Sequence, residues 1–173
     1  MERDLAELIR DIPDFPKPGV VFKDITPLLG DPAGFAAAVD RLAEHFVGRR
    51  VDKVVGIEAR GFVLAAPIAH RLGAGLVPVR KPGKLPWDTQ AVEYELEYGT
   101  DRLEVHRDAV QPGERVAIID DVLATGGTAA AAAQLIEAIG GEVVGLGFLM
   151  ELAFLDGAAR LAGWEHVTLM RFD

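Results

Sequence analysis

Residues 115–128 constrain the fold of this chain more than any other stretch. Residues 116–119 form a short apolar run rich in β-branched side chains, which is typical of a strand buried on both faces of a parallel sheet. Two adjacent carboxylates, Asp120 and Asp121, follow this run and are expected to end the strand. An Ala-rich helix is then predicted over residues 129–139. This order of elements indicates an open α/β sheet with a ligand site at the carboxyl ends of its strands.

The loop between the acidic pair and this helix, residues 124–128, has the composition of a phosphate-binding site. Its backbone N–H groups and two threonine hydroxyls can surround a phosphate dianion at the positive end of the helix, and its two glycines allow a close approach. Asp120 and Asp121 can accept hydrogen bonds from ribose hydroxyls and help to hold a divalent cation. A plain helix cap behind a solvated acidic pair is the alternative, but carboxylates at the end of a strand favour the ligand site.

Composition narrows the class of protein. A chain of 173 residues suits a single domain with a substantial core. No apolar run approaches a membrane span, and residues 1–4 lack the apolar stretch of a secretion signal, so we expect a cytoplasmic protein with no membrane partner. The absence of cysteine excludes disulfides and thiolate chemistry. The net charge of −9 argues against a nucleic-acid partner.

Strands alternate with helices along the chain, which predicts a mostly parallel, doubly wound sheet flanked by helices. The predicted helices are residues 5–12, 32–46, 62–72, 129–139 and 156–161, and the predicted strands are residues 51–57, 76–79, 116–119, 143–149 and 166–170. Residues 80–105 interrupt this pattern. From residue 92 the period changes to two, so we expect a half-buried antiparallel hairpin with Tyr94, Leu96 and Tyr98 on its apolar face.

Residues 80–89, before this hairpin, are basic, rich in proline and glycine, and without an apolar period. Such a long exposed loop is typical of a lid over an active site, and its composition suits a segment that moves as a unit. Arg80, Lys81 and Lys84 would then bring positive charge to an anionic substrate, against the negative net charge of the chain. A solvated basic loop without a ligand is the alternative.

Arg60 and Glu97 are two further charged residues of interest. Arg60 follows the strand at residues 51–57, so the sheet-edge rule brings it to the same crevice as the acidic pair, where a guanidinium suits a pyrophosphate. A surface arginine beside an ordinary turn is the alternative. Glu97 lies on the polar face of the hairpin with Glu93 and Glu95, and the alternation does not distinguish the three.

Four segments of the sequence resemble those of one enzyme family. Residues 120–128 resemble the phosphoribosyl-pyrophosphate (PRPP) motif of type I phosphoribosyltransferases and are not a P-loop, since no lysine follows the glycines. Residues 58–62 resemble a second segment of the family. Residues 15–24, and residues 81–86 leading to residues 96–99, resemble segments that are particular to its adenine-specific members. The chain is similar to the adenine phosphoribosyltransferases essentially from end to end.

The resemblance implies a glycosyltransferase reaction in which adenine and PRPP give AMP and pyrophosphate, with Mg²⁺ as cofactor. It assigns the substrate phosphates and ribose to a set of residues in three groups. The 5′-phosphate is assigned to Ala124, Thr125, Gly126, Gly127 and Thr128, the ribose hydroxyls to Asp120 and Asp121, and the pyrophosphate to Arg60, Lys81 and Lys84, with Arg80 reaching it from the same or a neighbouring subunit. Mg²⁺ would be held through pyrophosphate and ribose with the acidic pair nearby, without direct protein ligands.

The resemblance also assigns the base site and the catalytic groups. Val21, Phe22 and Lys23 would line the adenine, with Phe22 stacking on the ring and backbone groups reading its amine edge. Glu97 matches the acid that the family is proposed to place near the purine N7, so the implied catalytic residues are Glu97 and Arg60.

The implied architecture is a single type I phosphoribosyltransferase domain over residues 1–173, assembled as a homodimer. Residues 1–30 would form a hood-like segment lining the base site, and residues 80–106 a flexible lid and hairpin. By position, the non-proline cis peptide of this family would join Glu58 to Ala59. Ala158 departs from the family pattern, which usually has arginine after the glycine; we expect a surface difference that could touch the dimer contact.

Two other functions fit part of the pattern. A phosphoribosyltransferase for an oxopurine or for orotate would share the PRPP motif. A regulator could keep the fold and ligand site without catalysis, but it would be expected to add a DNA-binding segment. The chain has neither a basic face nor a helix-turn-helix signal, and the lid and Glu97 favour the enzyme.

Overall fold

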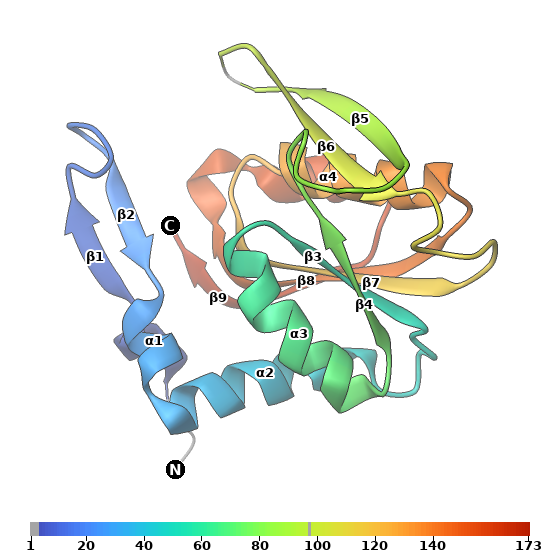
Figure 1. The fold of residues 1–173 in the computed structure, drawn as a ribbon. Helices are drawn as coiled ribbons and strands as arrows, with labels where there is room; N and C mark the ends of the chain where they lie inside the picture. Colours follow the sequence, from blue (N-terminus) through green and yellow to red (C-terminus); the bar gives the residue numbers. More distant parts are fainter. Residues whose placement is uncertain (1–3, 97) are drawn as a thin grey trace.

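The computed structural model describes residues 4–96 and 98–173, and its centre is a five-stranded sheet (Figure 1). The strands follow the order β4-β3-β7-β8-β9, and every neighbouring pair is parallel. Their bounds are β3 Lys53–Ile57, β4 Gly75–Val79, β7 Arg115–Leu123, β8 Glu142–Leu152 and β9 His166–Phe172. The connections turn in opposite directions from β3 and from β7, so a crevice is expected where the carboxyl ends of these two strands lie side by side.

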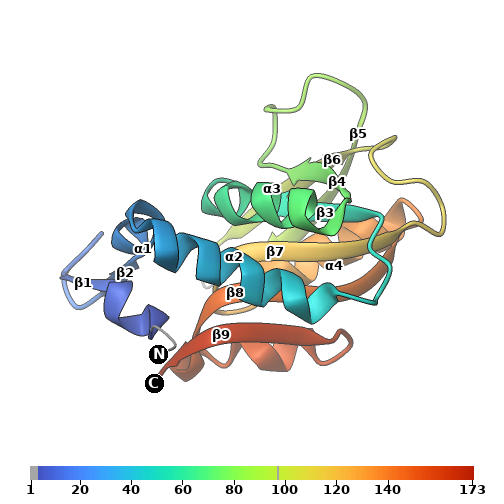
Figure 2. The same cartoon turned by 90° about the horizontal axis from the view of Figure 1, so that it is seen from below.

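Helices cover both faces of the sheet, and the central strand β7 is therefore buried on both sides. Ala117 and Ile119 pack with α2 (Pro32–Phe46) and α3 (Arg60–Leu72), whereas Val116 and Ile118 pack with α4 (Gly127–Ala138) on the opposite face. Alternate side chains thus enter two separate cores, which explains why the strand reads as a continuous apolar run. Figure 2 shows the same layers after a 90° turn. No helix in residues 4–96 and 98–173 is long and apolar enough to cross a membrane.

Several predicted elements are confirmed together with their end signals. Asp31 caps α2 by accepting a hydrogen bond of 2.7 Å from the N–H of Gly34, and Gly73 ends α3 in the left-handed conformation at φ 65°. The predicted helix near residue 156 is a 3₁₀ helix, η3 (Gly157–Leu161), which follows a shorter one, η2 (Ala153–Leu155).

The predicted helix at residues 5–12 is wrong beyond its first turn. A 3₁₀ helix, η1 (Leu5–Leu8), is followed by strand β1 (Arg10–Pro13), which pairs antiparallel with β2 (Val21–Asp24). The pairing with β2 supplies the backbone hydrogen bonds that a local helical period cannot predict. In Figure 1 this β1–β2 hairpin stands to one side of the sheet, and short helix α1 (Thr26–Gly30) joins it to α2.

The prediction that the acidic pair ends the central strand is also wrong. β7 continues to Leu123, because β8 runs alongside it and pairs as far as Glu151. Asp120 and Asp121 therefore lie within a strand, and both side chains lie next to the first turn of α3. Asp121 is buried, with 5% of its surface exposed.

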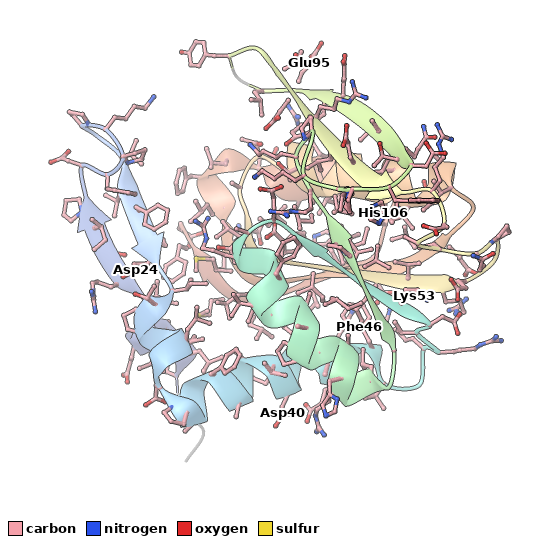
Figure 3. All side chains as sticks on the ribbon, viewed as in Figure 1. Asp24, Asp40, Phe46, Lys53, Glu95 and His106 are labelled. Atoms are coloured by element: carbon pink, nitrogen blue, oxygen red, sulfur yellow. The ribbon has the colours of Figure 1, made fainter. Side chains whose placement is uncertain are left out.

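The insertion forms the predicted antiparallel hairpin, from β5 (Thr89–Glu95) and β6 (Thr100–His106), which lies over α4. Figure 3 labels Glu95 and His106, which mark the ends of the two strands. Tyr94 packs against the core as expected, but Leu96 and Tyr98 lie beyond the end of β5 and are 45% and 82% exposed, so their predicted apolar face is wrong. Glu97 lies outside the described residues.

Candidate active site

A cavity of about 590 Å³ lies at the carboxyl ends of β3 and β7. Its walls come from the β2 strand, the β3–α3 loop, the lid, the β5–β6 hairpin and the β7–α4 loop. The lining residues are Val20, Val21, Phe22, Lys23, Ile57, Glu58, Ala59, Arg60, Lys81, Tyr94, Leu96, Asp101, Leu103, Asp120, Asp121, Val122, Leu123, Ala124, Thr125, Gly126, Thr128, Ala129 and Leu152. Segments that are distant in the sequence therefore meet in one cavity, at the place the sheet-edge rule predicts.

Arg60 and Asp121 form an ion pair in the lining of this cavity. Arg60 is the first residue of α3, and its Nε donates a hydrogen bond of 2.5 Å to Oδ2 of Asp121. Burial opposes the charge on Arg60, but the hydrogen bond and the charge of Asp121 outweigh it and raise the pKa of Arg60. The guanidinium is about half exposed, so part of it faces the cavity and can bind an anion.

Asp120 differs from its neighbour because it forms no ion pair with any cation in the described part of the chain. Burial and the adjacent charge of Asp121 raise the pKa of Asp120 well above its ordinary value. Its Oδ1 accepts a hydrogen bond of 2.9 Å from the N–H of Asp121. Gly61 lets α3 approach this side chain, since a Cβ there would lie 2.8 Å from Oδ1 of Asp120. The ionised form of Asp120 would be stabilised by a hydrogen-bond donor or a cation brought by a ligand.

The loop at residues 124–128, called the glycine loop below, packs against helix η3. Gly126 precedes α4 in the left-handed conformation at φ 80°, and a Cβ there would overlap the carbonyl oxygen of Gly157. A Cβ on Gly157 would in turn overlap the carbonyl oxygen of Ala124. Of the predicted phosphate-binding residues, Gly127 begins α4 and does not line the cavity, whereas the other four do.

The lid is attached to the β3–α3 loop by Glu58, whose side chain was given no role by the sequence analysis. Glu58 accepts hydrogen bonds from Nζ of Lys84 and, at 2.6 Å, from the N–H of Lys81, and Arg80 Nε lies 3.5 Å from it. Burial opposes ionisation of Glu58, but these donors and charges outweigh it and lower its pKa. The Glu58–Ala59 peptide bond is cis, as expected from the resemblance. Lys81 lines the cavity. Arg80 and Lys84 pair with Glu58 and do not line it.

The three predicted base-site residues lie together on β2 and line the cavity. The ring of Phe22 lies 5.2 Å from the ring of Phe15 and 5.4 Å from the guanidinium carbon of Arg60. Lys23 directs its ammonium away to Asp11, at 2.6 Å. β2 pairs with β1 along one edge only, so in the described structure its other edge keeps backbone donors and acceptors for a ligand.

Tyr94 and Asp101 are cavity residues that sequence reasoning missed. Oδ2 of Asp101 accepts hydrogen bonds from Nζ of Lys81 at 2.8 Å and from the hydroxyl of Tyr94 at 3.3 Å. The Tyr94 hydroxyl in turn accepts a hydrogen bond of 3.3 Å from Thr128. The alternation of the hairpin predicts Tyr94 as a core residue, and Asp101 follows a turn, so only the β5–β6 register reveals that the two are partners.

The described part of the chain contains no group of three or more His, Asp or Glu side chains arranged to hold a metal ion. Asp120 and Asp121 are two carboxylates beside a cavity. Mg²⁺ usually keeps several waters and binds substrate phosphates, so it would fit beside this pair when it arrives with a phosphorylated substrate.

Comparison with known proteins gives a consistent set of relatives. The phosphoribosyl transferase domain model matches residues 29–168. The adenine phosphoribosyltransferase of Roseiflexus sp. (strain RS-1) is 58% identical over 172 residues, which cover 99% of this chain and 100% of the relative. The crystal structure of adenine phosphoribosyltransferase from Thermoanaerobacter pseudethanolicus has a TM-score of 0.94 and 55% identity, covering 97% of this chain and 98% of its own. The structure of the Saccharomyces cerevisiae adenine phosphoribosyltransferase, complexed with an imino-altritol bisphosphate and adenine, has a TM-score of 0.90 and 40% identity. The match covers 95% of this chain and 96% of the yeast chain.

Proposed function

The chain belongs to the phosphoribosyltransferase family, among its adenine-specific members, and we propose that the cavity at the carboxyl ends of β3 and β7 is its active site. The enzyme transfers the 5-phosphoribosyl group from PRPP to adenine, giving AMP and pyrophosphate in purine salvage. The observation that carries the site assignment is the meeting of four segments in one cavity: β2, the β3–α3 loop, the lid and the β7–α4 loop.

The β7–α4 loop is assigned to the 5′-phosphate and the acidic pair to the ribose. Ala124, Thr125, Gly126 and Thr128 line the cavity at the start of α4, where backbone N–H groups and the helix dipole favour an anion. Gly127 contributes its backbone as the first residue of the helix. We assign the ribose hydroxyls to Asp120 and Asp121, because both carboxylates lie beside this loop and accept hydrogen bonds.

The pyrophosphate is assigned to Arg60 and to the cations of the lid. Arg60 and Lys81 both line the cavity, and their charges would stabilise the leaving group. Lys84 and Arg80 are now held at Glu58. Their assignment to the pyrophosphate therefore requires these cations to exchange the carboxylate for the substrate.

Adenine is assigned to the β2 side of the cavity. Phe22 would stack on the purine ring, and the unpaired edge of β2, with Val21 and Lys23, would read its amine edge through backbone groups. Glu97 is proposed as the acid near the purine N7. Its neighbour Leu96 lines the cavity, which supports this placement.

These groups suit displacement at the anomeric carbon. The reaction builds oxocarbenium character, so it needs a neutralised leaving group and a sugar held in line with the incoming base. Arg60 and Lys81 would neutralise the pyrophosphate, and Asp120 and Asp121 would orient the sugar. Glu97 would act as an acid at N7 and so offset the proton that the purine loses from N9. Mg²⁺, when bound with the pyrophosphate beside the acidic pair, would supply further positive charge to the leaving group.

We also propose a homodimer in the cytoplasm. Val63 on α3 and Leu76 on the edge strand β4 are 42% and 46% exposed, and a second copy covering this edge would bury them. A subunit packed there would also lie close to Arg80, which follows β4 directly. The cytoplasmic location rests on the sequence and on the substrates, which are small metabolites of the cell interior.

Titration of PRPP with Mg²⁺ into the protein tests these assignments. Replacing Asp120 and Asp121 together with Asn should weaken PRPP binding while circular dichroism shows the fold intact. Asp108→Asn, on an exposed turn after β6, is the matched control and should bind PRPP as the wild type does. Unchanged PRPP affinity in the double Asn variant would contradict the ribose assignment.

A further inference from the structure

The ammonium group of Lys81 forms an ion pair with Asp101 at the edge of the cavity. The distance from Nζ to Oδ2 of Asp101 is 2.8 Å, and both residues line the cavity. The two come from different elements, Lys81 from the lid and Asp101 from β6. The Lys81 side chain is 51% exposed and that of Asp101 only 22%, so the carboxylate is the more firmly enclosed of the two.

Asp101 is itself held by the hairpin. Its Oδ1 accepts a hydrogen bond of 2.8 Å from the N–H of Arg102, and its Oδ2 accepts one from the hydroxyl of Tyr94, its partner across β5 and β6. The hydrogen bond from Lys81 lowers the pKa of Asp101, so the carboxylate is ionised at neutral pH. Burial raises the pKa of Tyr94, so its hydroxyl keeps the proton that it donates.

An ammonium group carries three N–H donors, and Asp101 engages Lys81 through one oxygen. Among the described residues Asp101 is the partner of the Lys81 ammonium, so its other donors can bind an anion in the same cavity. Holding the ammonium in advance removes part of the entropy cost of ordering a long side chain when the substrate binds. Tyr94 also bonds to Thr128, so the hairpin places the lid cation relative to the glycine loop.

We propose that Asp101, oriented by Tyr94, is a positioning residue that holds Lys81 ready for the pyrophosphate group of PRPP. This inference rests on the proposed function, since Lys81 must meet the pyrophosphate. It predicts that removing the charge of Asp101 weakens PRPP binding. Simple competition between Asp101 and the pyrophosphate for Lys81 would have the opposite effect, because the variant would bind PRPP more tightly.

Calorimetric titration of PRPP with Mg²⁺, without adenine, tests the proposal in the wild type, Asp101→Asn, Lys81→Met and the double variant. Asp101→Asn should raise the Kd for PRPP by about three- to tenfold, as expected for a lost ordering contribution. The same change in the Lys81→Met background should have no further effect, because the two residues act as a unit. Tyr94→Phe should shift the Kd in the same direction by less, and Asp108→Asn should not shift it.

Ribose 5-phosphate, which lacks the pyrophosphate, separates positioning from structural damage. Its Kd should be the same for the wild type and Asp101→Asn. Parallel weakening of both ligands would overturn the proposal and indicate a disturbed cavity. Unchanged or tighter PRPP binding in Asp101→Asn, with weaker binding in Lys81→Met, would overturn it while leaving the role of Lys81 in place. Normal PRPP binding in Lys81→Met would overturn both this proposal and the assignment of Lys81 to the pyrophosphate.

Discussion

The Nε of Arg60 donates a hydrogen bond of 2.5 Å to Oδ2 of Asp121, and this bond joins the start of α3 to the central strand. The carboxylate is almost fully buried and the guanidinium is about half exposed. One side chain therefore neutralises the inner carboxylate of the acidic pair while presenting charge to the cavity. Arg60, which is assigned to the pyrophosphate, is thus also the ion-pair partner of Asp121, which is assigned to the ribose.

Arg60→Met should destabilise the protein, because it leaves the carboxylate of Asp121 buried without its cation. We expect a loss of about 1–3 kcal/mol in the free energy of unfolding, below the full cost of breaking a buried pair since Arg60 is half exposed. Urea denaturation at pH 7 measures this difference. Arg71→Met is the control on the same helix, because Arg71 pairs at 2.7 Å with Asp40, whose carboxylate is half exposed and not buried. Its loss should stay within about 0.5 kcal/mol, and equal losses in both variants would contradict the account.

Gly157→Ala should disturb the 5′-phosphate site from behind. The new Cβ would overlap the carbonyl oxygen of Ala124, so the glycine loop must move. We expect weaker binding of ribose 5-phosphate, measured by titration, together with a lower melting temperature. Gly163→Ala is the control, since a Cβ there meets nothing within 4 Å. Wild-type affinity in Gly157→Ala would show that the loop does not depend on η3.

Glu58→Gln should make stability less dependent on pH. The folded-state pKa of Glu58 lies below its ordinary value of 4.5, so its ionised form stabilises the fold above about pH 4.5, and this contribution is lost as the pH falls through the folded-state pKa. We expect the variant to be less stable than the wild type by about 1–2 kcal/mol at pH 7, with the gap closing below pH 4.5. Chemical denaturation across pH 3–7 tests the expectation, with the exposed Glu93→Gln as control. A gap that widens towards acid would give the wrong sign.

The sequence predicts the layers of this fold well because its signals are local. The apolar run of β7 and the caps Asp31 and Gly73 need no tertiary information. The sequence-based prediction fails where pairing with another strand determines the structure. Ile12 lies in a strand because it pairs with β2, and β7 continues past Asp121 because it pairs with β8. Both errors arise because the backbone hydrogen-bond partners of a segment can lie on another strand, which the sequence of that segment alone does not reveal.

The candidate site follows the same division. The sheet-edge rule correctly predicts that Arg60 and Asp120 share a crevice, because strand ends meet whatever the loops do. It cannot predict the partners Glu58, Tyr94 and Asp101, since their roles depend on how the lid and the hairpin fold back over the sheet. A charged residue in a loop carries no sequence signal of which carboxylate will hold it.

Glu97→Gln should lower turnover by roughly 10²–10⁴-fold, the usual contribution of a positioned acid. The expectation rests on the match of residues 96–99 to the adenine-specific family. Glu93→Gln and Glu95→Gln are the controls, since both residues are exposed on β5 and the alternation of the hairpin does not separate the three. Steady-state kcat for adenine measures the effect. Similar losses in all three variants would remove the special role of Glu97.

Discrimination between adenine and hypoxanthine tests the central claim most directly. A site that reads an amine edge through backbone groups leaves those groups unpaired against an oxo group, which costs orders of magnitude in kcat/KM. A coupled assay of pyrophosphate release, with PRPP and Mg²⁺ at saturation, gives kcat/KM for each base. We predict a value for adenine about 10³-fold or more above that for hypoxanthine. Comparable values for the two bases would contradict an adenine-specific site.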